Sequence, residues 1–331
     1  MNNIAKSPEH NSIPAKLKAV LLRLPTALYM MIILMLAYGV IVDHYFSWSN
    51  LSNILSQAAP LLVIACGQTL IVLMQGTDLS VGAMASAVGV IWFFLLNMGV
   101  SMPLSILLSL AAGLLSGFLN GMIAAKGLLP VFIVTLGTQN IYKSAALLLA
   151  HDQTLYYSSG FFRFIAKSAF LGLTWSVWIA LLCFLLTWIL LKKTAFGMKV
   201  TGIGGNAEVL TLSGASISRT TILAFMYTGC MAAVGALLLC CRIESGNPNA
   251  GSGIEFNSIA AVLLGGTSLR EGRGGVEGTI FGVLLLQILK SGLTQAGISS
   301  IYQNAIIGTV VLAAIIFDEI IKRQQRIRGV I

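Results

Sequence analysis

Long runs without a charged side chain constrain the fold of this sequence more than any other feature. No charged residue occurs from Ala58 to Met74, and none follows Asp78 until Lys126. Of the 331 residues, 57% are hydrophobic and 9% are charged, whereas soluble domains carry about 25% charged residues. A membrane-spanning barrel would show alternating segments of about ten residues instead of continuous runs. The sequence therefore predicts an all-α integral membrane protein.

The apolar runs also predict how often the chain crosses the bilayer. A crossing helix needs about 20 apolar residues, and nine runs approach that length: 27–42, 58–74, 81–98, 102–125, 130–150, 174–191, 221–240, 276–296 and 300–317. A tenth run, 256–266, is too short to cross as a simple helix.

Basic residues decide between nine and ten crossings. They precede the first run and follow the last run: Lys16, Lys18, Arg23, Lys322, Arg323, Arg326 and Arg328. Because Lys and Arg gather in cytoplasmic segments, both termini are expected in the cytoplasm. An even number of crossings follows, so we expect about ten transmembrane helices, with 256–266 crossing as a broken helix.

This topology divides the chain into a cytoplasmic N-terminal segment (1–25), a transmembrane domain (26–317) and a cytoplasmic C-terminal tail (318–331). One long cytoplasmic loop covers 192–220, and two outer loops cover 151–172 and 241–255. The first outer loop contains FFRFIAKSAF, which predicts a helix in the outer interface. The net charge of +9 fits cytoplasmic loops of a membrane protein and no nucleic acid partner is expected. Five cysteines without metal-ligand spacing are interpreted as reduced core residues.

Two segments separated by 190 residues suggest an internal pseudo-repeat. Residues 72–82 and 262–272 share six identities in eleven positions, and both contain Gly-Thr where an apolar run ends. Transporter folds are often built from such repeats, although two unrelated helix ends would give the same pattern. Small residues four apart predict two tightly packed helix faces, formed by Gly113, Gly117, Gly121 and by Gly274, Gly278, Gly282.

The sequence contains no pattern typical of a catalytic or metal site. His10, His44 and His151 have no cysteine or acidic partner at ligand spacing. The segment GGTSLREGRGG lacks the G-x-x-x-x-G-K-[ST] phosphate loop, so we expect no bound cofactor and no ATP hydrolysis by this chain alone. Asp78 and Lys143 are the only candidates for ionisable residues in mid-membrane, and Lys143 can reach the outer headgroups. This scarcity argues against an ion-coupled carrier.

Polar but uncharged side chains within the predicted helices outline a candidate pathway. Gln68, Thr69, Gln139 and Asn140 interrupt otherwise apolar runs. Such a lining suits a neutral, hydroxylated solute that is recognised through hydrogen bonds.

Several ordered motifs resemble one family. GTDLSVGA (76–83) is similar to the signature, usually GIDLSVGS, of permease subunits of ribose-type ATP-binding-cassette (ABC) sugar importers. The resemblance extends over nearly the whole chain, through segments 50–55, 134–141, 194–219, 251–274 and 292–308. It implies a multi-pass protein of the bacterial inner membrane, in which 26–317 is the permease domain.

The resemblance also implies partners and site residues. The partners are a cytoplasmic ATPase that uses ATP and Mg²⁺, a periplasmic sugar-binding protein and a second permease copy, either identical or related. The permease is then no enzyme, because a separate chain supplies the ATPase. The expected translocation pathway consists of Gln68, Thr77, Asp78, Ser80, Gln139, Asn140, Thr267 and Ser268. Thr77 stands where the family pattern has Ile.

Within the long cytoplasmic loop, NAEVLTLSG (206–214) resembles the coupling helix of this transporter class, whose pattern is Glu-Ala-Ala, three residues, then Gly. Glu208 and Gly214 match, whereas Val209 and Leu210 replace the two alanines. Asn206 is suited to cap the helix start, and Gly214 can end it. The expected ATPase-coupling residues are therefore Asn206, Ala207, Glu208, Leu210 and Gly214. A loop that is only a tether is the alternative.

The buried carboxylate of Asp78 needs a reason. We hypothesise that Ser80 and the free amides of the following helix satisfy it, so that Asp78 fixes a helix break and lines the inner exit. Direct contact with a sugar is the competing interpretation. For the whole chain, import of a monosaccharide is favoured. The alternatives are import of a sugar-like signalling molecule, an ATP-independent secondary transporter and a membrane scaffold or sensor without transport activity.

Overall fold

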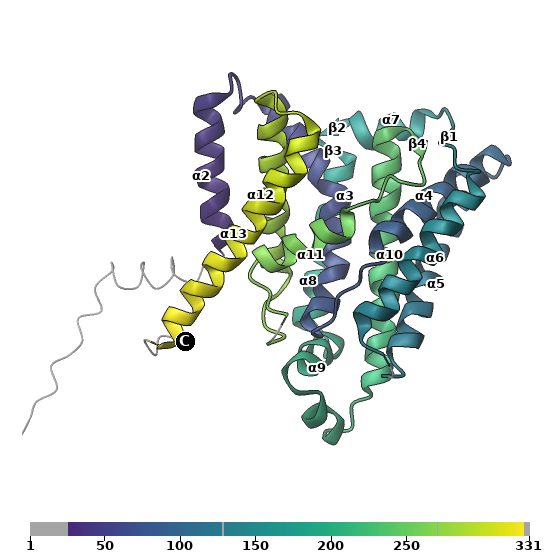
Figure 1. Ribbon diagram of the computed structural model, residues 1–331. Coiled ribbons are helices and arrows are strands. Elements are labelled where there is room, and N and C mark those ends of the chain that lie inside the picture. The colour runs from purple at the N-terminus through teal and green to yellow at the C-terminus, as the bar shows by residue number, and fades with distance from the viewer. Residues whose placement is uncertain (1–25, 128, 270, 328–331) are drawn as a thin grey trace, which may run out of the picture.

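The computed structural model describes residues 26–127, 129–269 and 271–327, which form twelve helices and four two-residue strands (Figure 1). The predicted N-terminal segment and the last residues of the C-terminal tail lie outside the described residues. The helices are α2 (Thr26–Ile41), α3 (Trp48–Leu73), α4 (Val81–Asn97), α5 (Met102–Ala124), α6 (Val131–Leu149), α7 (Gly160–Lys167), α8 (Trp175–Lys193), α9 (Ala195–Leu212), α10 (Ile217–Ile243), α11 (Ile254–Leu264), α12 (Val276–Gln295) and α13 (Ser300–Ile327).

The predicted apolar runs are confirmed as helices. Five of them, α3, α5, α8, α10 and α12, are long and apolar enough to cross a membrane. The short run predicted at 256–266 is the 11-residue helix α11. Helix α3 begins at Trp48 rather than at residue 58, because the Ser47 hydroxyl caps it by accepting from the Asn50 amide at 3.3 Å. Hydropathy alone misses this polar first part of the helix.

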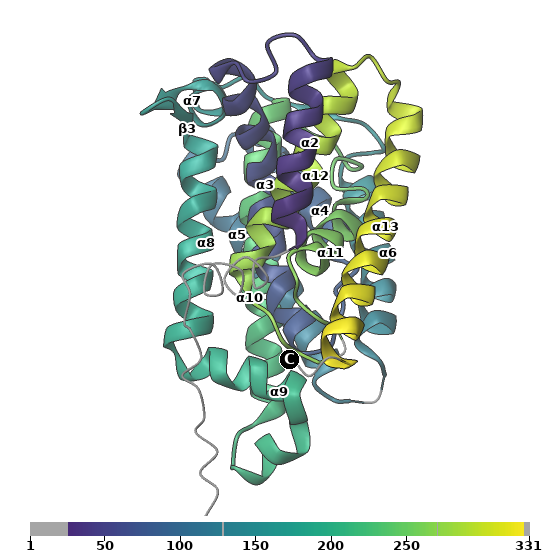
Figure 2. The ribbon, with the colours of Figure 1, turned by 90° about the vertical axis from the view of Figure 1, so that its left-hand side faces the viewer.

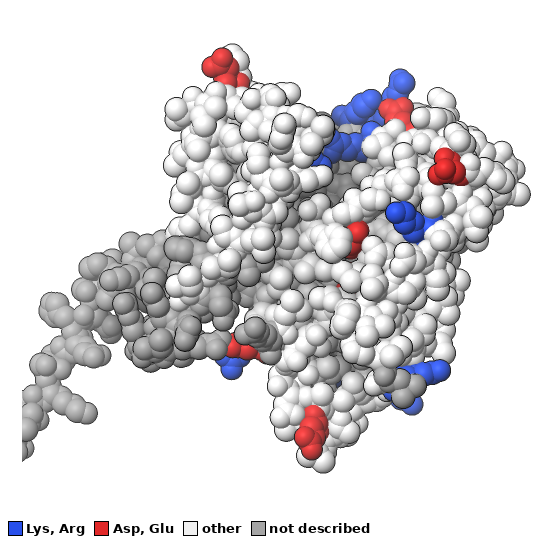
Figure 3. Space-filling view, in the orientation of Figure 1, with Lys and Arg blue, Asp and Glu red and all other residues white. Residues whose placement is uncertain are grey.

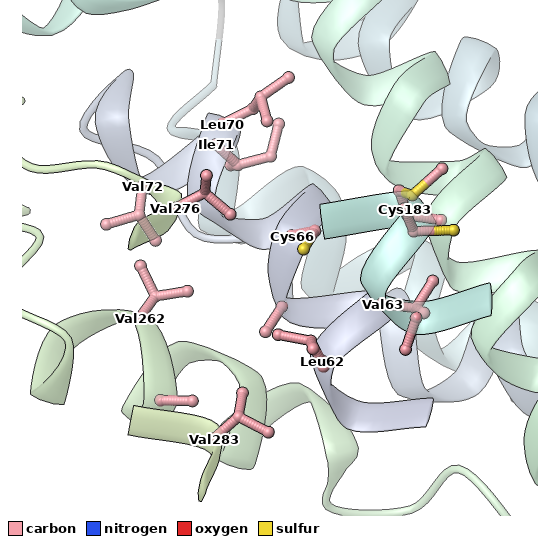
Figure 4. Packing of buried hydrophobic residues seen from close by; sticks show 14 of the residues in the cluster. Leu62, Val63, Cys66, Leu70, Ile71, Val72, Cys183, Val262, Val276 and Val283 are labelled. Carbon is pink, nitrogen blue, oxygen red and sulfur yellow. The ribbon is translucent and has the colours of Figure 1, made fainter. Parts of the chain in front are cut away.

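Helices α3 and α10 form the centre of the bundle. Side chains of α3, α8, α11 and α12 meet in its main hydrophobic cluster, part of which Figure 4 shows. All five cysteines are free, as predicted, and four are buried. Helix α5 packs against α10 through the predicted glycine face. A Cβ atom on Gly121 would lie 2.8 Å from the Ile222 Cα, so the two backbones approach as closely as glycine allows.

The second glycine series is only partly a helix face. Gly278 and Gly282 lie in α12; Gly278 faces Gly265, the residue after α11, and Gly282 faces Ala261 of α11. Gly274 precedes α12, has a φ of +137° and packs against Thr267. The prediction that all three share one helical face is therefore wrong for Gly274, because the chain is still in a turn at that residue.

The two predicted outer loops lie together at one end of the molecule, which departs from a purely α-helical fold there. Strand β1 (Leu155–Tyr156) pairs with β4 (Ser245–Gly246), and β2 (Ala169–Phe170) pairs with β3 (Leu173–Thr174), each pair antiparallel. Helix α7, in the predicted interface segment, inserts Phe162 against Phe93 at 5.2 Å between ring centroids. Helix α9 lies at the opposite end (Figures 1 and 2).

Substituting Gly117 tests the close approach of α5 and α10. In Gly117→Ala, the new Cβ would lie 2.9 Å from the Phe225 carbonyl carbon, and we expect overpacking to cost about 1–3 kcal/mol of unfolding free energy. The matched control is Gly137→Ala in α6, where nothing lies within 4 Å of the new atom. Thermal unfolding of the purified proteins in detergent measures both. Equal midpoints for the two variants would contradict the packing described.

Candidate functional site

Asp78 lies in the turn between α3 and α4 and is fully buried. Its Oδ1 atom accepts hydrogen bonds from the Ser80 amide at 2.8 Å and from the Ser80 hydroxyl at 2.6 Å. This is an Asx-turn, in which a side-chain carboxylate bonds the backbone two residues onward. The Ser80 part of the hypothesis is confirmed for Oδ1, but among the described residues no amide within α4 donates to Asp78. The Oδ2 atom has no hydrogen-bond partner among the described residues.

Hydrogen bonds tie this turn to the neighbouring helices. The Asn120 amide of α5 donates to the Ser80 hydroxyl at 2.8 Å, and the Tyr142 hydroxyl of α6 donates to Asn120 Oδ1 at 3.0 Å. The Thr135 hydroxyl of α6 accepts from the Leu79 amide at 3.2 Å and lies 3.1 Å from the Thr77 carbonyl oxygen, to which it donates. The start of α4 is therefore fixed through side chains of two other helices.

The turn between α11 and α12 is the second copy of the suspected repeat, and it is satisfied differently. The buried Thr267 hydroxyl accepts from the Gly275 amide at 3.3 Å, and the Ser268 hydroxyl accepts from the Glu271 amide at 3.3 Å. The first left-handed residue after the helix is Gly266 here (φ +87°) but Gln75 in the first turn (φ +61°), and Gln75 is one position earlier in the alignment. Both copies break at Gly-Thr, but their left-handed residues fall at different positions of the alignment.

The remaining predicted pathway residues do not all face one another. Gln68 is fully buried in α3, and neither of its side-chain polar atoms has a partner among the described residues. Gln139 donates to Glu255 Oε1 at 3.3 Å, across from α6 to α11. Asn140 is exposed and donates to the Leu136 carbonyl of its own helix at 2.9 Å, so it does not line an interior path within this chain.

Glu255 was missed from the sequence. Residues 241–255 were expected to form an outer loop, but Glu255 is in the first turn of α11 and is only 5% exposed. Its Oε2 atom contacts Gly82 of α4 and has no hydrogen-bond partner among the described residues. An acidic residue just before an apolar helical run is a helix-start signal, and it would have extended the predicted run by two residues to Ile254.

Two cavities share Arg242 near the end of α10 that faces the strands. One, of about 220 Å³, lies between α3, α10, α11, α12 and α13, with the polar residues Gln57, Asn257, Gln287, Arg242 and Lys290 in its lining. The other, of about 360 Å³, is lined mostly by hydroxyl-bearing residues and includes Asn53 and Lys167. Figure 3 shows the surface hollowed in this region, with basic side chains gathered at its upper end. The lining can donate and accept many hydrogen bonds.

The predicted coupling segment, 206–214, begins at Asn206 and ends at Gly214, as expected. The backbone of Asn206 leaves the helical conformation within α9 (φ −159°), and its Oδ1 atom accepts from the Val209 amide at 3.1 Å. Gly214 adopts a φ of +81°, its amide donates to the Thr211 carbonyl, and the Ala215 amide donates to the Leu210 carbonyl. These two bonds form a Schellman motif. The N-cap and C-terminal glycine predictions are confirmed.

The coupling segment presents apolar side chains at the far end of the molecule. Val209 is 61% exposed and Leu212 is 83% exposed, while Glu208 is also at the surface. Ala207 and Leu210 are partly buried. A short, well-capped helix with exposed apolar residues is suited to pack against another protein.

Residues 50–315 match the family model described as "Branched-chain amino acid transport system / permease component". This chain belongs to that permease family. It is 35% identical to the ribose import permease protein RbsC of Bacillus subtilis (strain 168) over 291 residues. This matched stretch covers 86% of this chain and 89% of that protein. No solved structure matches the chain.

Two further relatives carry other descriptions. The probable ABC transporter permease protein YphD of Escherichia coli (strain K12) is 37% identical over 284 residues, 86% of each chain. The L-arabinose transport system permease protein AraH of the same strain is 29% identical over 294 residues, 89% of this chain and 90% of that protein. The resemblance to ribose-type ABC permeases is confirmed, and this chain is a transport component rather than an enzyme.

Substitutions of Asp78 test whether its carboxylate only accepts the hydrogen bonds of Ser80 or also contacts the solute. In Asp78→Asn, the amide oxygen still accepts from Ser80, so we expect normal assembly and partial uptake activity. In Asp78→Leu, both hydrogen bonds are lost and two buried donors remain, which costs about 1–3 kcal/mol each. Thermal unfolding and solute uptake are measured on both variants. Complete loss of uptake in Asp78→Asn, with normal assembly and ATPase stimulation, would show that Asp78 contacts the solute.

Proposed function

We propose that this chain is the membrane-spanning permease subunit of a binding-protein-dependent ABC importer that carries a monosaccharide, a ribose-like pentose or a hexose, into the cell. ATP and Mg²⁺ are used by a separate ATPase subunit. The observation that carries the proposal is similarity over almost the full length to ribose import permeases, at 35% identity in one case. The family description names branched-chain amino acids, but the relatives whose names state a substrate name ribose and L-arabinose.

The chain crosses the bacterial inner membrane ten times, with both termini in the cytoplasm. The path around α11 supports the tenth crossing. Helix α10 runs from α9 towards β4, and the turn after α11 is back in contact with α9 through Gly272 and Gly204. Residues 247–272 therefore return the chain to the α9 end before α12 begins. With ten crossings, the α9 end is cytoplasmic and the strand end faces outward.

The solute reaches the chain at the two cavities near Arg242. Their amide and hydroxyl groups can bond the hydroxyls of a sugar, and the periplasmic binding protein delivers the sugar to this outer end. The path then continues inward past Gln68, Gln139, Asp78 and Ser80 towards Thr77, Thr267 and Ser268. Unpartnered atoms on Gln68 and Asp78 support this route, because buried polar groups without a partner are costly unless something else bonds them.

The exposed side of Asn140 marks a surface that faces outside this chain. A second permease copy, identical or related, covers it, so that Asn140 lines the path between two subunits. The ATPase docks on the coupling segment, where Asn206, Ala207, Glu208, Leu210 and Gly214 set the shape of the helix. Import of a sugar-like signalling molecule would use the same machinery. An ATP-independent carrier or a scaffold is disfavoured by the similarity to ABC permeases.

Reconstitution into proteoliposomes tests the proposal. The permease is assembled with its native ATPase and binding protein, and uptake of labelled ribose, arabinose and galactose is measured with and without ATP. We expect uptake of one of these sugars only with ATP and both partners. The control is the permease alone. Uptake by the permease alone would identify a secondary transporter, and no flux with all partners would favour a scaffold.

Introducing a charged side chain into segment 206–214 tests whether this surface docks the ATPase. We expect Leu212→Asp to reduce co-purification of the ATPase by about tenfold or more, because an interface core excludes unpaired charge. The matched control is Leu171→Asp, which changes a leucine that is 76% exposed in the β2–β3 loop at the opposite end of the molecule. That variant should retain the ATPase. Equal co-purification of both variants would place the ATPase elsewhere.

A further inference from the structure

Gly204 lies outside the coupling segment 206–214 and packs closely against two other parts of the chain. It lies in the last turn of α9 before the break at Asn206 and is buried. Its carbonyl oxygen accepts a hydrogen bond from Gln75 Nε2 at 2.6 Å. A Cβ atom on Gly204 would lie 2.8 Å from the Gly272 Cα and closer still to the Leu73 carbonyl oxygen. Gly204 therefore touches the end of α3 and the turn after α11 at once.

Gly272 also has no room for a side chain where it meets Gly204. Gly272 has a φ of +59°, and a Cβ atom there would lie 2.6 Å from the Gly204 Cα. Gln75 has a left-handed backbone (φ +61°), which is uncommon for a residue other than glycine. This conformation ends α3 and places the Gln75 side chain on the Gly204 carbonyl. Backbone meets backbone on both sides, and no side chain fits between them.

The neighbouring glycine has no such role. Nothing lies within 4 Å of a Cβ atom built on Gly205, and Gly205 is exposed. The close packing is therefore a property of one residue rather than of the whole glycine pair.

These contacts join three segments that matter for transport. The segment 206–214 begins two residues beyond Gly204, the turn after Gln75 leads into α4, and the turn around Gly272 leads into α12. Close-packed backbone is hard to compress, so a small displacement is passed on rather than absorbed by flexible side chains. A shift of the coupling segment must then move both turns or break their contact with Gly204.

We propose that Gly204 is a positioning residue that transmits movement of segment 206–214 to both Gly-Thr turns together, and thereby couples ATP hydrolysis to the movement of α4 and α12. This inference rests on the proposed function, because it assumes an ATPase bound to 206–214. It adds a residue that the coupling motif does not contain. Its side-chain partner is Gln75, and its backbone partner is Gly272.

Paired alanine variants test the role. Gly204→Ala and Gly205→Ala are reconstituted with the ATPase and the binding protein, and the sugar transported per ATP hydrolysed is measured. We expect Gly204→Ala to hydrolyse ATP but to lower this ratio about tenfold, within the usual range of coupling between sites. Gly205→Ala should keep the parental ratio. A purely structural role of Gly204 would lower assembly, hydrolysis and transport together and leave the ratio unchanged.

Gln75→Leu provides a second measurement if Gly204→Ala fails to assemble, as judged by size-exclusion chromatography. It removes the hydrogen bond to Gly204 without adding an atom to the tight contact, and we expect a lowered ratio with normal assembly. A parental ratio in Gln75→Leu, or in an assembled Gly204→Ala, overturns the inference. If the parent complex itself shows no ATP-dependent uptake, the proposed function fails instead.

Discussion

The interior of a bilayer offers no water to hydrogen-bond a peptide group, so every interruption of a helix must be satisfied from within the protein. This chain interrupts its helices at two Gly-Thr turns, and each turn solves the problem with different groups. The first uses the carboxylate of Asp78 and the hydroxyl of Thr135 from another helix. The second closes on itself through Thr267 and Ser268. The first turn is therefore anchored to α5 and α6 through side chains, whereas the hydrogen bonds of Thr267 and Ser268 stay within the second turn.

Close approach of backbones is the second consequence of the membrane environment. Lipid is as apolar as leucine, so helices gain little from burying apolar side chains and more from close van der Waals contact. Gly121 against α10 and Gly282 against α11 follow this rule within the helices. The contact between Gly204 and Gly272 applies it to turns. Glycine thus serves two needs in one chain, which are packing along helices and direct contact between a turn and α9.

The sequence predicted the features that depend on neighbouring residues in the chain. Hydropathy located the helices, and capping chemistry located both ends of the segment 206–214, because Asn206 and Gly214 act on their nearest backbone neighbours. It failed where distant segments decide. Glu255 looked like part of a loop until α4 and α6 covered it, and the sequence did not show that Asn140 lies on the exposed face of α6. The spacing of Gly274 suggested a helix that begins only at Val276. Gly204 carried no signal, since its partners are more than 60 residues away in sequence.

Helix α3 connects the two ends of the molecule that these features occupy. From Gln57, in the wall of one cavity, to Leu73, whose carbonyl oxygen lies next to Gly204, the helix rises about 24 Å at 1.5 Å per residue. Pro60 lies within this helix and lines the same cavity. Proline has no amide hydrogen to bond the preceding turn, so the helix is weakest against bending where it borders the cavity. Pro60 therefore puts the most easily bent part of α3 in the wall of the cavity, about 20 Å along the helix from Leu73, whose carbonyl oxygen lies next to Gly204.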